Sequence, residues 1–110
     1  MADFVELLIE AGANYNTVIN VGEADGSAKN LISCNARSQM RKSYYSSTAY
    51  NFEVNIVDPA NGVIRMEMSD QTTSNIRAGR YVYDVEIEYP TGSVERIFEG
   101  IVTVSPNVTR

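Results

Sequence analysis

The chain has 110 residues, of which 44% are hydrophobic and 21% charged, and its formal net charge is −5. These values are typical of one globular domain, residues 1–110, and exclude a disordered or collagen-like chain. The 14 acidic residues outnumber 9 basic ones, which argues against nucleic acid as a partner because phosphates require clustered Lys and Arg. Apolar stretches are far shorter than the roughly 20 residues that cross a bilayer, and no basic-then-apolar leader opens the chain. We therefore expect neither membrane association nor conventional secretion.

Missing residue types restrict the chemistry further. The sequence has no His and no Trp, and Cys34 is its single cysteine. Catalytic triads that need His and zinc sites that need His are therefore excluded, and an intrachain disulfide is impossible. Carboxylates, Ser, Lys and one Cys remain, without an arrangement that indicates a reaction. We expect no enzyme activity, no cofactor, no metal and no small-molecule substrate.

Strand-forming residues dominate the sequence. Val and Ile far outnumber Leu, and seven Tyr accompany them. Apolar and polar residues alternate, which is typical of half-buried strands, most clearly where Tyr81, Tyr83, Val85 and Ile87 share one face. Strands are expected at residues 4–10, 15–21, 32–42, 52–56, 63–68, 80–89 and 94–104. The spacing of seven strands without a long helical pattern favours a two-sheet sandwich over a parallel sheet.

The segments between strands carry local signals. Residues 58–62 read Asp-Pro-Ala-Asn-Gly, a turn that predicts a hairpin between the flanking strands. Residues 69–76 are the one helix candidate, capped by Ser69 or Asp70, and would cross from one sheet to the other. Gly100 falls at an inward position, where a glycine indicates a bulge or a large ring close by, and a tyrosine is the expected neighbour.

The predicted fold is all-β: an immunoglobulin-like antiparallel β-sandwich of about seven strands with one short helical crossover. Inward positions of the two hairpin strands include Phe52 and Ile64, and those of the last strand include Val94, Phe98 and Val102. The Gly-x-Tyr-x-Tyr run from Gly79 also suits a tyrosine corner, in which a phenol bonds to upstream backbone. A small barrel is the alternative architecture.

Several segments together resemble β-sandwich domains of tailed-phage virions. The most specific are ARSQMRKS at residues 36–43, the run at residues 79–87, Glu99-Gly100, and the terminal Val108-Thr109-Arg110. Residues 12–110 resemble most the N-terminal domain of phage baseplate upper proteins. Those proteins continue into a further binding region, whereas this sequence ends at Arg110. The resemblance implies a structural protein of the virion: a capsid decoration or cement protein, or an adaptor of the neck, tail or baseplate.

Six residues are candidate contacts with partner proteins. Phe4 and Leu8 lie out of phase with the inward residues of the first strand, as do Ile97 and Ile101 in the last. If the two ends of the chain run side by side, these four residues form one outer apolar patch. They would equally be scattered surface residues, or be buried by a strand that switches sheets. The other two candidates are Tyr44 and Tyr45, which lie in a Ser-rich loop, the composition of adaptable contact surfaces or of a loop folded over the sandwich end.

Charged residues give weaker signals. Arg37 and Arg41 would face Asp84, Glu86 and Glu88 if the strands at residues 32–42 and 80–89 are neighbours, and cross-strand ion pairs would follow. Such pairs are typical of any solvated sheet face. The Glu86–Glu88 spacing alone does not indicate a glycosidase, because nothing supplies the walls of a cleft.

Two turns and the cysteine are weaker candidates for sites. Asp25 with Glu23, and Asp58 with Asn61, offer too few oxygens for calcium. Cys34 falls at an inward strand position and is expected to be a small core residue, not a nucleophile.

Two functions follow. The first is a non-enzymatic structural protein of a phage particle, present in many symmetry-related copies and bound to other phage structural proteins. The second is a receptor- or glycan-recognising sandwich that uses end loops bearing Tyr44, Tyr45 and Tyr50.

Overall fold

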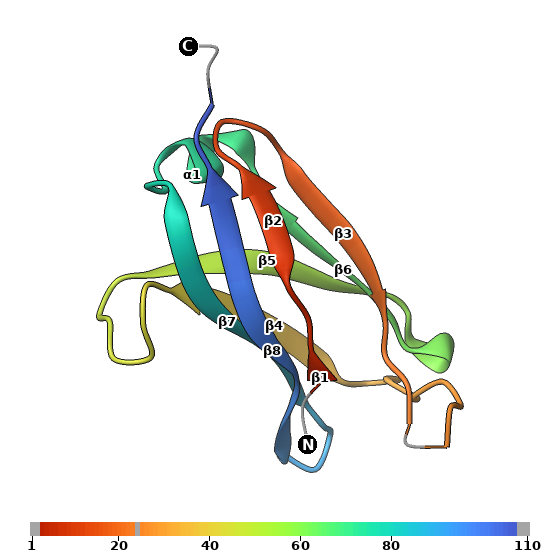
Figure 1. Cartoon of the computed structure of the whole chain (residues 1–110). Coiled ribbons are helices and arrows are strands. Elements are labelled where there is room, and N and C mark those ends of the chain that lie inside the picture. Colours follow the sequence, from red (N-terminus) through yellow and green to blue (C-terminus); the bar gives the residue numbers. More distant parts are fainter. Residues whose placement is uncertain (1–2, 24, 108–110) are drawn as a thin grey trace.

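The structure, a computed structural model, describes residues 3–23 and 25–107. The terminal Val108-Thr109-Arg110 of the phage resemblance lies outside the described residues. Strands make up most of the fold (Figure 1). They are β1 (Asp3–Phe4), β2 (Leu7–Glu10), β3 (Tyr15–Asn20), β4 (Asn35–Arg41), β5 (Ala49–Asp58), β6 (Val63–Met68), β7 (Gly79–Glu88) and β8 (Val94–Ser105). A short 3₁₀ turn at Pro59–Asn61 and helix α1 (Asp70–Ser74) complete the fold.

The predicted immunoglobulin-like sandwich is confirmed. Its strands follow the order β1-β8-β7-β4-β5-β6-β3, with β2 also paired to β8. The long strand β5 belongs to both layers, because residues 49–52 pair with β4 and residues 53–58 pair with β6 (Figure 1). One layer therefore holds β1, β2, β8, β7 and β4, and the other holds β6 and β3. This sharing of β5 gives the sandwich a partly barrel-like closure.

The N-terminal strands differ from the expected antiparallel pattern. β1 and β2 both run parallel to β8, with Phe4 beside Glu99 and Leu7 beside Val102, whereas the remaining strand pairs are antiparallel. The predicted single strand at residues 4–10 is also interrupted after Phe4. The two ends of the chain nevertheless run side by side, which was the condition for a shared outer patch.

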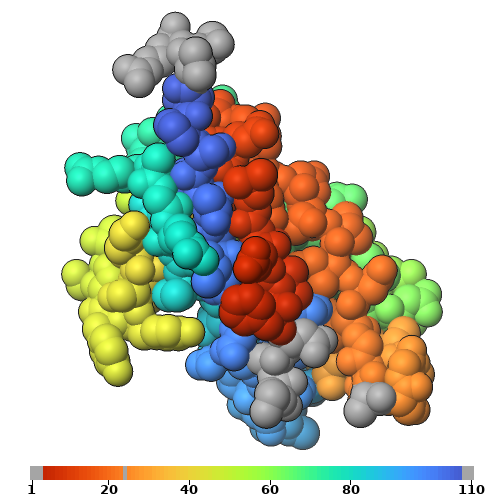
Figure 2. Space-filling model, in the orientation of Figure 1, coloured from red at the N-terminus to blue at the C-terminus, as the bar shows by residue number. Residues whose placement is uncertain are grey.

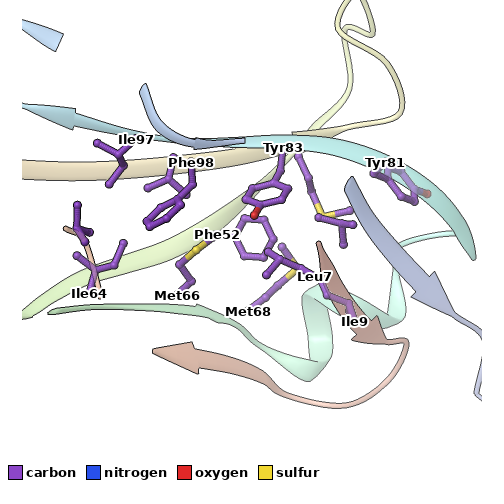
Figure 3. Packing of buried hydrophobic residues seen from close by; sticks show 14 of the residues in the cluster. Leu7, Ile9, Phe52, Ile64, Met66, Met68, Tyr81, Tyr83, Ile97 and Phe98 are labelled. Carbon is purple, nitrogen blue, oxygen red and sulfur yellow. The ribbon is translucent and has the colours of Figure 1, made fainter. Parts of the chain in front are cut away.

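The core lies between the layers and centres on Phe52, the residue at which β5 passes from one layer to the other. The ring of Phe52 lies 6.3 Å from that of Tyr83 on one layer, between ring centroids (Figure 3). It lies 5.9 Å from the ring of Tyr15 on the other layer. Most predicted inward residues of β6, β7 and β8 are buried. They include Ile64, Met66, Met68, Tyr81, Tyr83, Val85, Ile87, Phe98, Val102 and Val104. Val94, predicted to be inward, is exposed at the start of β8.

The helical crossover and the tyrosine corner are both present. Ser69 caps α1 by accepting a hydrogen bond from the Thr72 amide at 3.3 Å, and the helix carries the chain from β6 to β7. The buried Thr73 hydroxyl donates to the Ala13 carbonyl at 2.8 Å, which attaches α1 to the turn after β2. The Tyr81 phenol donates to the Arg77 carbonyl at 2.6 Å, four residues upstream.

Gly100 lies directly opposite Tyr83 in the β7–β8 register, so a tyrosine is its cross-strand neighbour as expected, but the space beside its Cα is filled by backbone. A Cβ atom at this position would lie 2.1 Å from the Val5 carbonyl oxygen, so backbone rather than a tyrosine ring occupies the space. Val5 lies in the interruption between β1 and β2, and its amide donates to the Glu99 carbonyl at 2.9 Å. The glycine thus allows the N-terminal segment to pass close over β8.

Candidate functional site

A polar hollow of about 560 Å³ lies on the outer face of the layer that contains β4, β7 and β8. Strand alternation explains its polarity, because the residues that point away from the core on these strands are the charged ones. The hollow is lined mainly by Arg37, Gln39, Arg41, Tyr44, Asn51, Val82, Asp84, Glu86, Arg96 and Glu99. The loop after β4 projects from the body of the molecule at one side (yellow in Figure 2).

Ion pairs cross the floor of the hollow. Arg37 lies directly opposite Glu86 in the β4–β7 register, and its Nε lies 2.9 Å from the carboxylate. Arg96 lies 3.3 Å from Asp84 and 3.2 Å from Glu99. The expected cross-strand pairing of β4 arginines with β7 carboxylates is therefore confirmed at Arg37.

Burial and neighbouring charges shift the pKa values of charged groups on the floor of the hollow. Burial raises the pKa of Asp84 above its ordinary value, the nearby Glu86 carboxylate raises it further, and Arg96 acts in the opposite direction. The hydrogen bond to Glu86 raises the pKa of Arg37. The guanidinium and carboxylate groups balance each other in number, so the lining is close to neutral in a chain of net charge −5. This mixture offers donors and acceptors side by side and favours a polar, uncharged ligand over a strongly charged one.

Tyr44 lines the hollow and is 71% exposed, while Tyr45 beside it is 98% exposed. Arg41 supports their loop by donating to the Ser46 carbonyl at 2.7 Å. Tyr50, the third tyrosine of the recognition hypothesis, instead packs edge-on against Tyr81 with ring centroids 6.3 Å apart. The structure thus separates two exposed tyrosines from one that joins the core.

The predicted apolar patch is only partly exposed. Phe4 and Leu8 are 62% and 59% exposed, and Ile101 is half-buried. Ile97 is only 7% exposed, so its prediction as an outward residue was wrong. The reason is a bulge: the β7–β8 register shifts so that Phe98 faces Val85 while Arg96 faces Glu86, which breaks the alternation at Ile97.

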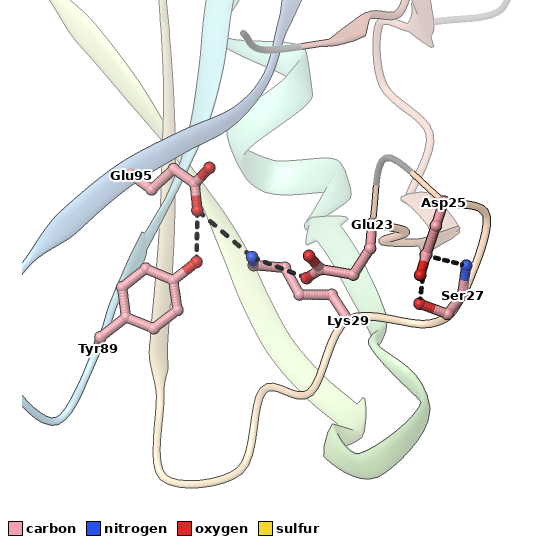
Figure 4. Close-up of polar contacts among 6 residues, drawn as sticks. All are labelled: Glu23, Asp25, Ser27, Lys29, Tyr89 and Glu95. Atoms are coloured by element: carbon pink, nitrogen blue, oxygen red, sulfur yellow. Dashed lines mark hydrogen bonds and ion pairs between the residues drawn. The ribbon is translucent and has the colours of Figure 1, made fainter.

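A polar cluster that the sequence did not predict connects two distant turns. Lys29 Nζ lies 3.1 Å from Glu23 and 3.5 Å from Glu95, and 5.4 Å from the centre of the Tyr89 ring (Figure 4). The Tyr89 phenol donates to Glu95. Hydrogen bonding with Tyr89 and Glu23 raises the pKa of Lys29, against the effect of burial, and the Tyr89 phenol lowers the pKa of Glu95. No local pattern predicts this cluster, because its two halves, Glu23 with Lys29 and Tyr89 with Glu95, come from segments that lie far apart in the sequence.

The weaker candidates occupy ordinary positions. Asp25 accepts hydrogen bonds from the backbone amide and the hydroxyl of Ser27 within its own turn (Figure 4). Asp58 accepts from the side-chain Nδ2 of Asn61 at 2.9 Å. Cys34 is a free thiol that packs partly against the core. Within residues 3–23 and 25–107, no cluster of three metal-ligating side chains and no helix long and apolar enough to cross a membrane is found.

Comparison with known proteins identifies a fold and no family. No family model and no curated protein matches the sequence. Among solved structures, the chain is similar to an internalin-like protein of Listeria monocytogenes, with a TM-score of 0.50 and 13% sequence identity. The similarity covers 94% of this chain but 28% of that protein. At this identity the likeness concerns the fold alone.

Proposed function

We propose that this chain is a non-enzymatic structural protein of a tailed-phage particle, acting through contacts with other phage structural proteins. The observation that carries the proposal is the exposed position of Phe4 and Leu8 on strands at the margin of a sheet. Two large apolar side chains exposed along the same sheet margin favour a protein partner. The phage assignment itself depends on the sequence resemblance at residues 36–43 and 79–87.

The partner contact would be centred on β1 and β2. Phe4 pairs with Glu99 and Leu8 with Thr103, so both side chains project from the same face of the sheet. The half-buried Ile101 lies between Glu99 and Thr103 on β8 and shares this face. Ile97 takes no part because it is buried. Tyr44 and Tyr45 would provide a second contact on the projecting loop. Repetition of such contacts by symmetry makes weak individual contacts sufficient for assembly.

Mass spectrometry of purified virions, followed by labelling of the chain in the particle, tests this function directly. The protein should be found in the particle in many copies, at the capsid, neck, tail or baseplate. The variant Phe4→Ser/Leu8→Ser should fold normally and fail to bind particles that lack the protein, whereas the control Val57→Ser, at an exposed position of β5, should bind. Absence of the chain from the particle refutes the proposed location.

The hollow supports a second function, recognition of a neutral glycan. Sugar hydroxyls both donate and accept hydrogen bonds, which suits alternating guanidinium and carboxylate groups, and the exposed ring of Tyr44 offers a stacking surface. A glycan array tests this function with the wild-type chain and the variants Tyr44→Ala and Arg37→Ala. Loss of binding in both variants would support the hollow as the glycan-binding site. A wild-type chain that binds no glycan excludes this function.

A further inference from the structure

Strand β3 forms the second margin of the sheet and differs from the margin formed by β1 and β2. In the described part of the chain, β3 pairs with β6 alone. Immunoglobulin sandwiches commonly place the first strand beside the second, in the ABED sheet. Here β1 and β2 both pair with β8 instead, so the hydrogen-bonding groups on one side of β3 have no strand partner among the described residues (Figure 1).

The two margins differ in their protection against pairing with another chain. Proteins usually protect an edge strand with charges, prolines, bulges or interruptions. The β1–β2 margin is interrupted after Phe4 and carries the exposed Glu6 and Glu10. Strand β3, Tyr-Asn-Thr-Val-Ile-Asn, runs without interruption and is the one described strand with no charged residue, proline or glycine. It is therefore the least protected edge.

The inner face of β3 is also incompletely covered. Tyr15, Thr17 and Ile19 point toward the core but remain partly exposed. Their partners across the β3–β6 ladder, Met68, Met66 and Ile64, are buried. A further strand beside β3 would cover the exposed parts of these side chains. Burial of apolar area would then add to the new backbone hydrogen bonds.

The sequence of β3 is nearly symmetrical about Val18. Asparagines occupy positions 16 and 20, and the β-branched residues Thr17 and Ile19 flank the centre. In an antiparallel pair of two β3 strands centred on residue 18, Asn16 faces Asn20 of the second copy and Thr17 faces Ile19. In each of these cross-strand pairs, amide with amide and β-branched with β-branched, the two side chains are compatible neighbours. Copies of net charge −5 repel, and this uncharged strand brings no like charges opposite each other.

We propose that the chain dimerises by antiparallel pairing of β3 with β3 of a second copy, with the two Val18 residues opposite each other on the two-fold axis. Val18 is 53% exposed and points away from the core, so it is available at the centre of this pair. The inference goes beyond the proposed function, because it names a second copy of the chain as a partner at another sheet margin. The dimer itself requires no virion.

Sedimentation equilibrium of the purified chain, at about 10 µM to 1 mM, tests the pairing in the range where small interfaces associate. The wild-type chain should dimerise, and its β3 amides should exchange hydrogen more slowly as concentration rises. Val18→Lys and Val18→Glu should each raise the dimer dissociation constant by about tenfold or more, because like charges would face each other on the axis. Val57→Lys, at an exposed valine 47% accessible on the same layer, is the matched control and should dimerise as the wild type does.

A mixture decides whether residue 18 faces itself. Equal amounts of Val18→Lys and Val18→Glu should form a heterodimer at least as stable as the wild-type dimer, because opposite charges then face each other. Thermal unfolding of each variant establishes that it is folded before association is compared. A monomeric wild type at 1 mM, undiminished association of Val18→Lys, or failure of the mixture to recover association refutes the proposal. None of these results bears on virion location, which the particle experiment decides separately.

Discussion

The phenol of Tyr83 donates a hydrogen bond to the carbonyl of Val5 at 2.7 Å, across 78 residues of sequence. It reaches the interruption between β1 and β2, where the Val5 amide also donates to the Glu99 carbonyl. Burial raises the pKa of this phenol, so it remains a proton donor throughout the physiological range. The contact fixes the N-terminal segment over β8, beside the exposed Phe4 on which the proposed function depends.

Tyr83→Phe should lower the free energy of unfolding by about 1–2 kcal/mol, because it removes the donor to the Val5 carbonyl while preserving the ring contact with Phe52. Urea unfolding measures the change. Tyr44→Phe removes a hydroxyl from an exposed ring and is the control, with an expected change close to zero. Equal effects of the two variants would contradict a specific role for the Tyr83 phenol.

Gly100→Ala should destabilise the fold by about 3 kcal/mol or more, because its Cβ would overlap the Val5 carbonyl, a backbone atom that has little freedom to move. Gly92→Ala provides the comparison. Gly92 has φ of +91° but open space around it, so strain alone should cost about 1–2 kcal/mol. A Gly100→Ala variant as stable as Gly92→Ala would show that the N-terminal segment does not pass this close to β8.

Phe52→Ala should lower the free energy of unfolding by about 3–5 kcal/mol, because it leaves a cavity between the two layers. Phe4→Ala removes the same side chain from an exposed position and should change stability by about 0.5 kcal/mol or less. Chemical denaturation of both variants gives the comparison. Comparable losses would mean that Phe52 is not at the junction of the layers.

The pH dependence of stability should report the Lys29 cluster. Because the pKa of Glu95 is lowered in the folded chain, its contribution is present above the unfolded value of about 4.3 and is lost as the pH falls through the folded value. The wild type should therefore be more stable than Glu95→Gln at neutral pH, by about 1 kcal/mol or less for so exposed a group, and the difference should vanish near pH 2. Lys29 does not change this sign, since its raised pKa keeps it charged from acid to neutral pH.

Thermal unfolding across this pH range measures the effect. Glu6→Gln, at an exposed position between β1 and β2, is the control variant for a general change in net charge. A difference between wild type and Glu95→Gln that is constant with pH would exclude a titrating contribution from Glu95.

The sequence predicted the elements well because their causes are local. Alternating burial in β6, β7 and β8 follows from side chains that point to opposite faces of a strand, and the turn at Pro59–Asn61 follows from residues that favour its backbone angles. The Tyr81 corner was likewise predictable, since the phenol reaches a carbonyl only four residues upstream. The ion pair of Arg37 with Glu86 required one further assumption, that β4 and β7 are neighbours.

The remaining features depend on contacts between distant segments, and only the tertiary structure decided them. The bulge that buries Ile97 arises from the register between β7 and β8, which alternation within β8 does not contain. The close approach at Gly100 could not be predicted without knowing that Val5 passes over β8. The Lys29 cluster forms only because two distant turns meet in the fold. The sequence by itself determined an all-β sandwich and its main inward faces, because side-chain alternation is a property of each strand. Edges, bulges and the hollow were decided by packing, because they depend on which strands become neighbours and in which register.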